Sequence, residues 1–129
     1  EGYDLVIVSR YKDNAKSEDD SLLTRLANYA FTNIVNILFG GHYTDAGVIY
    51  RAFKKELITS LRLDQNKNEA FEYLLSIRAA KKRLKIAEIP GDEPGRIGDN
   101  YSRAWPGFFG RIRGGLLVLR CIIKELARW

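Results

Sequence analysis

Residues 4–11 read DLVIVSRY, an apolar run with an aspartate at one end and Arg10 at the other. The four aliphatic residues at 5–8 favour a strand that is buried on both faces, so we expect a strand over 4–9. Comparable runs predict strands over 48–53 (VIYRAF) and 84–89 (LKIAEI), the second of which is followed by Pro90. Because proline lacks a backbone N–H, we expect that strand to stop before it.

The segments between and after these strands have helical patterns. They predict helices over residues 20–39, 54–61, 68–83 and 111–129. Strands that alternate with helices indicate an α/β fold, here with three short strands and about four helices. Ser17 and Asp20 resemble a capping box before the first helix, and Gly40 follows its end.

The first predicted helix is amphipathic. We expect its apolar stripe to face the core and its polar residues Arg25, Asn28, Thr32 and Asn36 to lie on the other side. The expected core stripe comprises Leu22, Leu23, Leu26, Ala30, Phe31, Ile34, Val35 and Leu38.

Composition sets wider bounds. The chain has 129 residues, of which 46% are hydrophobic and 29% charged, as in a single globular domain. No run of about 18 uncharged apolar residues predicts a membrane span. Cys121 is the single cysteine, which excludes an internal disulfide framework. The net charge of +5 suits an anionic partner but does not choose among phosphate, lipid headgroups and nucleic acid.

Four arginines recur at or near predicted strand ends or on polar helix faces: Arg10, Arg25, Arg51 and Arg96. Ligands of open α/β sheets bind at the carboxyl ends of strands, and the guanidinium fork suits phosphate oxygens. For each arginine the simpler alternative is a solvated surface residue. The sequence has no zinc-ligand spacing, and the lone His42 receives no role.

Three segments in order resemble the C-terminal half of a family 2 glycosyltransferase catalytic domain, of the dolichyl-phosphate-sugar synthase type with a GT-A fold. They are residues 4–11, 45–56 (DAGVIYRAFKKE) and 71–98, and the resemblance spans roughly residues 3–100. It implies a parent enzyme that moves a hexose, with inversion, from a nucleotide-diphosphate donor. The acceptor would be a polyprenyl phosphate, or a growing cell-wall or lipid-linked saccharide.

In such enzymes an N-terminal half binds the nucleotide and ends in an Asp-x-Asp motif that holds Mg²⁺ or Mn²⁺. This sequence opens where the family pattern is already past that motif. We therefore expect a fragment that is inactive alone and binds no metal itself. A strand over 4–9 that normally pairs within a larger sheet also predicts self-association.

The resemblance also suggests roles for individual residues. It places Asp45 and Arg51 in catalysis, and Arg10, Arg25 and Arg96 on the phosphate or acceptor. Supporting positions would be Ser9, Glu72, Gly98 and Arg103.

Two roles are open for Asp45: a general base for a hydroxyl acceptor, or an orienting partner of Arg51 or of the metal environment when the acceptor is an already anionic phosphate. Related synthases have Ser-Gly-Phe before the arginine where this chain has Val48, Ile49 and Tyr50. The acceptor is therefore left open.

The resemblance divides the chain into an acceptor-side half, residues 1–103, and an amphipathic helical segment, residues 104–129. In that segment Arg113, Arg120, Lys124 and Arg128 share one face of a helical wheel. The opposite face carries Val118, Leu119, Ile122, Ile123, Leu126 and Trp129. This helix either packs its apolar stripe on the domain or lies in a membrane interface. We expect a cytoplasmic protein, held peripherally at the inner face of the membrane in the second case.

A different class of function is a non-catalytic basic module that binds a membrane surface or nucleic acid. The chain has 21 Lys and Arg residues and 12% aromatic residues. The aromatic residues fall mostly on predicted core stripes, and no nucleic-acid motif is present, so we expect no nucleic-acid partner.

Overall fold

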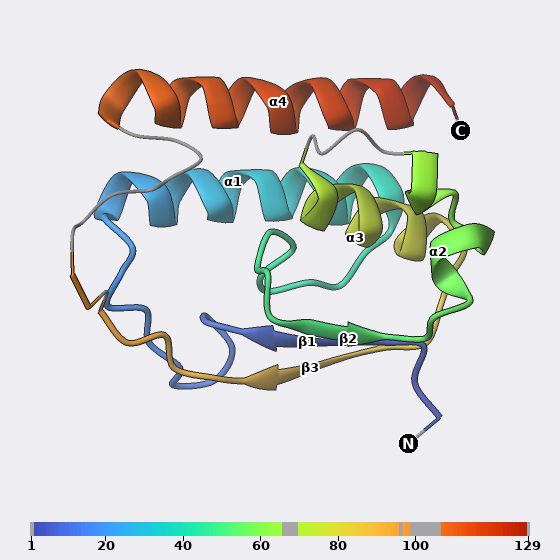
Figure 1. The fold of residues 1–129 in the computed structure, drawn as a ribbon, viewed down its shortest axis with the longest axis horizontal. Coiled ribbons are helices and arrows are strands. Elements are labelled where there is room, and N and C mark those ends of the chain that lie inside the picture. The colour runs from blue at the N-terminus through green and yellow to red at the C-terminus, as the bar shows by residue number, and fades with distance from the viewer. Residues whose placement is uncertain (1, 66–69, 96, 99–106, 129) are drawn as a thin grey trace.

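The computed structural model describes residues 2–65, 70–95, 97–98 and 107–128 (Figure 1). The elements are β1 (Leu5–Ser9), α1 (Leu22–Phe39), β2 (Arg51–Phe53), α2 (Leu57–Ser60), the 3₁₀ helix η1 (Leu63–Gln65), α3 (Phe71–Lys81), β3 (Ile86–Pro90) and α4 (Gly107–Ala127). The predicted α/β class, with three short strands and four α-helices, is confirmed in the described residues.

The sheet is mixed, with the strand order β2-β1-β3. β1 and β3 are parallel, with Leu5 opposite Ile86 and Ser9 opposite Pro90. β1 and β2 are antiparallel, with Leu5 opposite Phe53. Because β1 and β3 are parallel, the segments that follow them, at Arg10 and Gly91, leave the sheet at the same end of the strands.

One face of the sheet carries the helices, and the core lies between the two layers (Figure 1). Leu5 and Ile7 of β1 point into this core, where they meet buried residues of α1 and α3 such as Val35 and Leu75. No described helix covers the opposite face, where Ile89 is 49% exposed. The predicted self-association remains a prediction.

Two strand predictions were wrong at their ends. β2 begins at Arg51 rather than at residue 48, because the loop before it uses its backbone to bond to the helices: Ala46 N donates to Thr32 of α1, and Ala46 O accepts from Ser76 of α3. β3 includes Pro90, whose partner in the register is Ser9. Lys85 O and Gly91 N form hydrogen bonds with β1, so the backbone nitrogen of residue 90 faces the opposite way, toward the free edge of the sheet. Proline is tolerated there because no N–H has to be donated at that position.

The predicted capping box was also wrong. Ser21 is the N-cap of α1, because its hydroxyl accepts a hydrogen bond from Thr24 N at 3.2 Å. Ser17 instead donates to Glu93 Oε2 at 2.6 Å and forms an isolated bridge with that residue. Gly40 ends α1 in a left-handed conformation, with φ of +71°.

The orientation of α1 differs most from expectation. Its buried residues are Asn28, Thr32, Val35 and Phe39. Most of the predicted core stripe points outward: Leu22 is 72% exposed and Leu26 57%. Val35 is buried as predicted, but it shares the buried face with Asn28 and Thr32, which were expected on the exposed side.

α4 packs against α1 and α3. Its buried Glu125 accepts hydrogen bonds from Arg78 Nη2 at 2.8 Å and Lys81 Nζ at 3.3 Å. Ile122 is buried as predicted, whereas Ile123 is 58% exposed and Leu126 is 47% exposed. No described helix is long and apolar enough to cross a membrane. The proposed boundary at residue 104 lies outside the described residues.

Candidate functional site

Asp45 is the centre of a buried polar cluster between α1 and the sheet. Its side chain is fully buried. One oxygen, Oδ2, accepts from Arg10 N at 3.2 Å and Arg10 Nε at 2.8 Å. The other, Oδ1, accepts from Arg10 Nη2 at 3.1 Å and from Asn28 Nδ2 at 3.0 Å. With both oxygens occupied and no exposed surface, Asp45 fixes the orientation of Arg10.

Arg10 directly follows β1, at the carboxyl end of the parallel strand pair. Its Nη1 lies 3.3 Å from Asp20 Oδ2 and 3.3 Å from Glu93 Oε2. Burial alone lowers the pKa of Arg10, but the hydrogen bonds and charge of Asp45, together with Asp20, outweigh it and hold the pKa above its ordinary value. Nη1 is thus the part of the guanidinium that Asp45 does not hold.

The loops that contain Asp20 and Glu93 are hydrogen-bonded to each other beside Nη1 of Arg10. Glu18 N donates to Glu93 O at 2.9 Å, and Glu93 N donates to Lys16 O at 2.8 Å. The Tyr11 hydroxyl donates to Asp20, and burial followed by that contact raises the pKa of Tyr11. An anion that approaches Arg10 from the loop side therefore has to replace Asp20 and Glu93 at Nη1.

The buried face of α1 supplies polar groups to the cluster. The Tyr73 hydroxyl donates to Asn28 Oδ1 at 2.8 Å, which leaves the Asn28 amide nitrogen to donate to Asp45. Thr32 Oγ1 accepts from Ala46 N at 3.2 Å. Burial, then the negative charge of Asp45, raises the pKa of Tyr73. The sequence analysis missed Asn28 and Thr32, although their spacing of four residues marks one helix face.

Arg51 is half-buried and binds backbone carbonyls and a hydroxyl. Nε donates to Val48 O at 2.9 Å, and Nη1 donates to Glu72 O at 3.0 Å and Ser76 Oγ at 3.1 Å. Nη2 donates to Ala46 O at 3.2 Å and also contacts Val48 O. Burial lowers the pKa of Arg51. The fork thus joins the loop at residues 46–48 to α3.

The same loop is held from the sheet side. Glu88 of β3 accepts from Thr44 N at 2.9 Å, Thr44 Oγ1 at 2.8 Å and Asp45 N at 3.3 Å. Ser9, which is buried, shares a hydrogen bond of 2.5 Å with Thr44 Oγ1. Sequence reasoning gave Ser9 a supporting position and missed Glu88, since one glutamate in a strand carries no distinctive pattern.

Gly47 allows the loop to approach α3 closely. A Cβ atom at this position would lie 2.6 Å from Cε2 of the Tyr73 ring. Any other residue would displace Tyr73, which holds Asn28 against Asp45. In the Asp-Ala-Gly sequence at 45–47, the aspartate supplies the buried carboxylate, and the glycine leaves room for the Tyr73 ring beside it.

The other predicted site residues lie farther from Asp45. Arg25 is exposed, with its Nη2 3.3 Å from Ser17 O on the loop that covers Arg10. Glu72 offers its carbonyl to Arg51, and Gly98 has a φ of +102°. Arg96 and Arg103 lie outside the described residues. Among the described residues, no group of three or more His, Cys, Asp or Glu could hold a metal ion.

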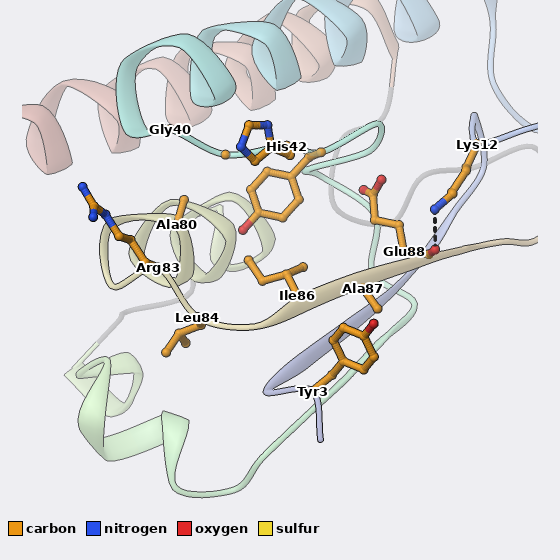
Figure 2. A pocket seen from close by; sticks show the side chains of 12 residues that line it. Tyr3, Lys12, Gly40, His42, Ala80, Arg83, Leu84, Ile86, Ala87 and Glu88 are labelled. Carbon is orange, nitrogen blue, oxygen red and sulfur yellow. Dashed lines mark hydrogen bonds between the residues drawn. The ribbon is translucent and has the colours of Figure 1, made fainter. Parts of the chain in front are cut away.

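A separate pocket of about 650 Å³ opens beside the free edge of β3 (Figure 2). His42, Tyr43 and Arg83 line it, together with residues of β3. The Lys12 amine donates to Glu88 O at 2.8 Å at one end of the pocket (Figure 2). Of the arginines singled out in the sequence, the three that the structure describes, Arg10, Arg25 and Arg51, do not line this pocket.

Fold and site together define an α/β domain with a buried aspartate that orients an arginine at the carboxyl end of a parallel strand pair, the usual place for ligands in such folds. Over 126 residues the chain is 29% identical to a dolichyl-phosphate hexose transferase of Haloferax volcanii. The aligned region covers 98% of this chain and 53% of that protein, so the chain spans about half the length of this relative. The comparison shows a distant relationship to a hexose transferase.

Neither a protein-family model nor a solved structure matches the chain significantly.

Proposed function

We propose that this chain is the acceptor-side part of a hexosyltransferase that uses a polyprenyl phosphate acceptor and a nucleotide-diphosphate sugar donor. The observation that carries the proposal is Arg10, which lies at the carboxyl end of β1 and is oriented by the buried Asp45. The alignment with the dolichyl-phosphate hexose transferase supports it, because it includes this segment and nearly all of the chain.

In this proposal Arg10 binds the acceptor phosphate through Nη1. Asp45 holds the Nε and Nη2 side of the guanidinium, and Asp20 and Glu93 contact Nη1. Those two carboxylates occupy positions that phosphate oxygens would take, since both groups are anionic oxygen acceptors for the same fork. Arg25 of α1, whose side chain reaches Ser17 O on the covering loop, is the next cation that a phosphate entering here would meet.

Asp45 and Arg51 then act as positioning residues. A general base must reach the proton that it removes, and the carboxylate of Asp45 is fully buried and saturated by donors. A phosphate acceptor is already anionic and attacks the sugar without a base. Arg51 holds the loop at residues 46–48 in place through carbonyl oxygens, and so keeps Asp45 beneath Arg10.

A divalent cation, when bound in such an enzyme, would neutralise the departing diphosphate. The described residues do not fit such an ion, because Asp45 is saturated and Asp20 and Glu93 face Arg10. We therefore assign no step of this chain to a metal. The inverting outcome of the transfer follows from direct attack of the acceptor phosphate on the anomeric carbon, with departure of the nucleoside diphosphate from the opposite side.

The test is calorimetric titration of the chain with geranyl phosphate, a short polyprenyl phosphate, and with geraniol. We expect binding of the phosphate only. Arg10→Lys keeps the charge but loses the fork, and should weaken binding roughly tenfold. Asp20→Asn should instead tighten binding, because it weakens a competitor for Nη1. Opposite effects of two neighbouring substitutions are not expected from a merely structural disturbance.

Arg83→Gln is the matched control, since Arg83 is an exposed arginine that lines the separate pocket beside β3. It should leave the affinity unchanged. Loss of binding in Arg83→Gln with full binding in Arg10→Lys would place the phosphate in that pocket and overturn the assignment. Equal binding of geraniol and its phosphate would overturn phosphate recognition altogether.

A further inference from the structure

α4 has two apolar sides, and only one of them meets the protein. Ile122 and Cys121 are buried against the core. A second stripe, at spacings of three and four residues, is exposed: Phe109, Ile112, Leu116, Leu119, Ile123 and Leu126, with Phe109 84% exposed. Helical spacing places these residues on one side of α4, turned away from the buried side. The described part of the chain leaves this stripe uncovered.

α1 carries a similar outward stripe because its polar side faces Asp45. Leu22, Leu23, Leu26, Tyr29 and Ile37 are between 54% and 80% exposed. The helix has no acidic residue, and its single basic residue is Arg25. Two long helices of one small domain therefore expose apolar stripes, which is more than scattered surface leucines would produce.

α4 runs alongside α1 and contacts it, and in Figure 1 it lies on the side of α1 that faces away from the sheet. Arg111 Nη1 of α4 lies 3.5 Å from the hydroxyl of Ser21, the cap of α1. Farther along, a Cβ atom at Gly115 would be 3.8 Å from the ring of Phe31. The small residue lets α4 approach α1, so the stripes border the same seam. We call the outward side of both helices the α1–α4 surface.

The charges of this surface have one sign. α4 carries Arg111, Arg113, Arg120 and Lys124, all exposed, and its only acid, Glu125, is buried against α3. Helical spacing places Arg113, Arg120 and Lys124 in a row beside the apolar stripe. An apolar strip flanked by cations is complementary to a bilayer with anionic headgroups.

We propose that the α1–α4 surface lies in the interface of an anionic lipid bilayer, with both helices parallel to the membrane plane. Neither helix is apolar enough to cross a membrane, in accord with this orientation. A second copy of the chain fits the surface less well, because two such surfaces would bring like charges together. The proposal does not depend on the transferase function, since a bilayer without any polyprenyl phosphate is sufficient for binding.

The test is sedimentation of the chain with vesicles of phosphatidylglycerol and phosphatidylcholine, compared with vesicles of phosphatidylcholine alone. We expect strong binding to the anionic vesicles, which added salt weakens. Replacement of Phe109, Leu116 and Ile123 by serine removes three large apolar groups and should reduce partitioning on the order of 100-fold. Replacement of Arg113, Arg120 and Lys124 by glutamine should reduce it to a similar extent on anionic vesicles only.

The matched control replaces three exposed isoleucines elsewhere, Ile49, Ile89 and Ile97, by serine. It removes a comparable number of apolar groups and should bind like the unaltered chain. Circular dichroism and the midpoint of thermal unfolding establish that each variant is folded. A polarity-sensitive dye attached at Leu26→Cys or Leu116→Cys should shift to the blue on anionic vesicles, whereas one at Ser60→Cys should not.

Three results would overturn the proposal. One is a folded chain that does not bind to anionic vesicles. Another is equal loss of binding in the control variant, which would mean nonspecific adsorption. The third is a dimer in solution that the Phe109, Leu116 and Ile123 variant dissociates while vesicle binding is absent, which would assign the α1–α4 surface to contact between copies of the chain.

Discussion

One side of α1 packs against the rest of the protein, and the other side is exposed. The buried side carries Asn28 and Thr32, which bond to the loop at Asp45 and Ala46. The outward side carries Leu22 and Leu26, which contribute little to the core. An amphipathic pattern therefore shows that a helix has two faces, and the groups it packs against decide which face turns inward.

The physical reason for the inverted helix is the buried carboxylate. A buried charge that lacks partners is strongly destabilising, so Asp45 requires donors from every element that surrounds it. Arg10 supplies them from the sheet and Asn28 from α1. An apolar helix face against Asp45 would leave part of the carboxylate unsatisfied. The outward apolar side follows from this requirement and is stable when another apolar medium covers it.

The largest expected effect on stability comes from removal of the buried carboxylate that α1 faces. Asp45→Ala leaves Arg10 without its main partner, and we expect the free energy of unfolding to fall by about 3–5 kcal/mol, as for other broken buried pairs. Urea unfolding at neutral pH measures it. Asp64→Ala, at an exposed aspartate of η1, is the control and should change little. A loss below about 1 kcal/mol in Asp45→Ala would mean that the cluster is solvated.

A smaller effect on stability is expected from the ion pairs that hold α4 against α3. Burial alone raises the pKa of Glu125, but Arg78 and Lys81 outweigh it and hold the pKa below its ordinary 4.5. A lowered folded-state pKa contributes stability above the unfolded value, and this stability is lost as the pH falls through the folded value. We therefore expect stability to decline below about pH 4.5, and less steeply in Glu125→Gln. Identical pH profiles of urea unfolding for the two chains would refute this role.

The sequence predicted the fold well where one local signal was enough. The apolar run at residues 5–8 produced β1, and the helical repeats placed α1, α3 and α4 within a few residues. Gly40 was correctly placed at the end of α1. The start of β2 and the cap at Ser21 were missed, because both depend on contacts between distant segments: the loop at residues 44–48 with α1 and α3, and Ser17 with Glu93.

The candidate site was predicted as a set of residues rather than as an arrangement. Asp45, Arg10 and Ser9 do meet in one cluster, but the sequence could not show that Asp45 holds Arg10 instead of Arg51. Which arginine is paired with which carboxylate depends on the path of a loop, and that path is set by Glu88, Asn36 and Gly47 together. Glu88 and Asn36 have no pattern of their own in the sequence.

The smallest expected effect separates the two possible orientations of α1. Leu26→Gln should change the free energy of unfolding by no more than about 0.5 kcal/mol, because the side chain is 57% exposed. If Leu26 lay in the core, as the helical pattern alone suggests, the same change would be expected to cost at least 2 kcal/mol, roughly the loss seen for buried leucines. Leu75→Gln, at a fully buried leucine of α3, provides that reference in the same protein. A neutral effect on stability together with weaker binding to anionic vesicles would mean that Leu26 acts on a membrane and not on the fold. A large loss of stability would instead place the apolar side of α1 inside, and the polar cluster at Asp45 would then lose Asn28 as a partner.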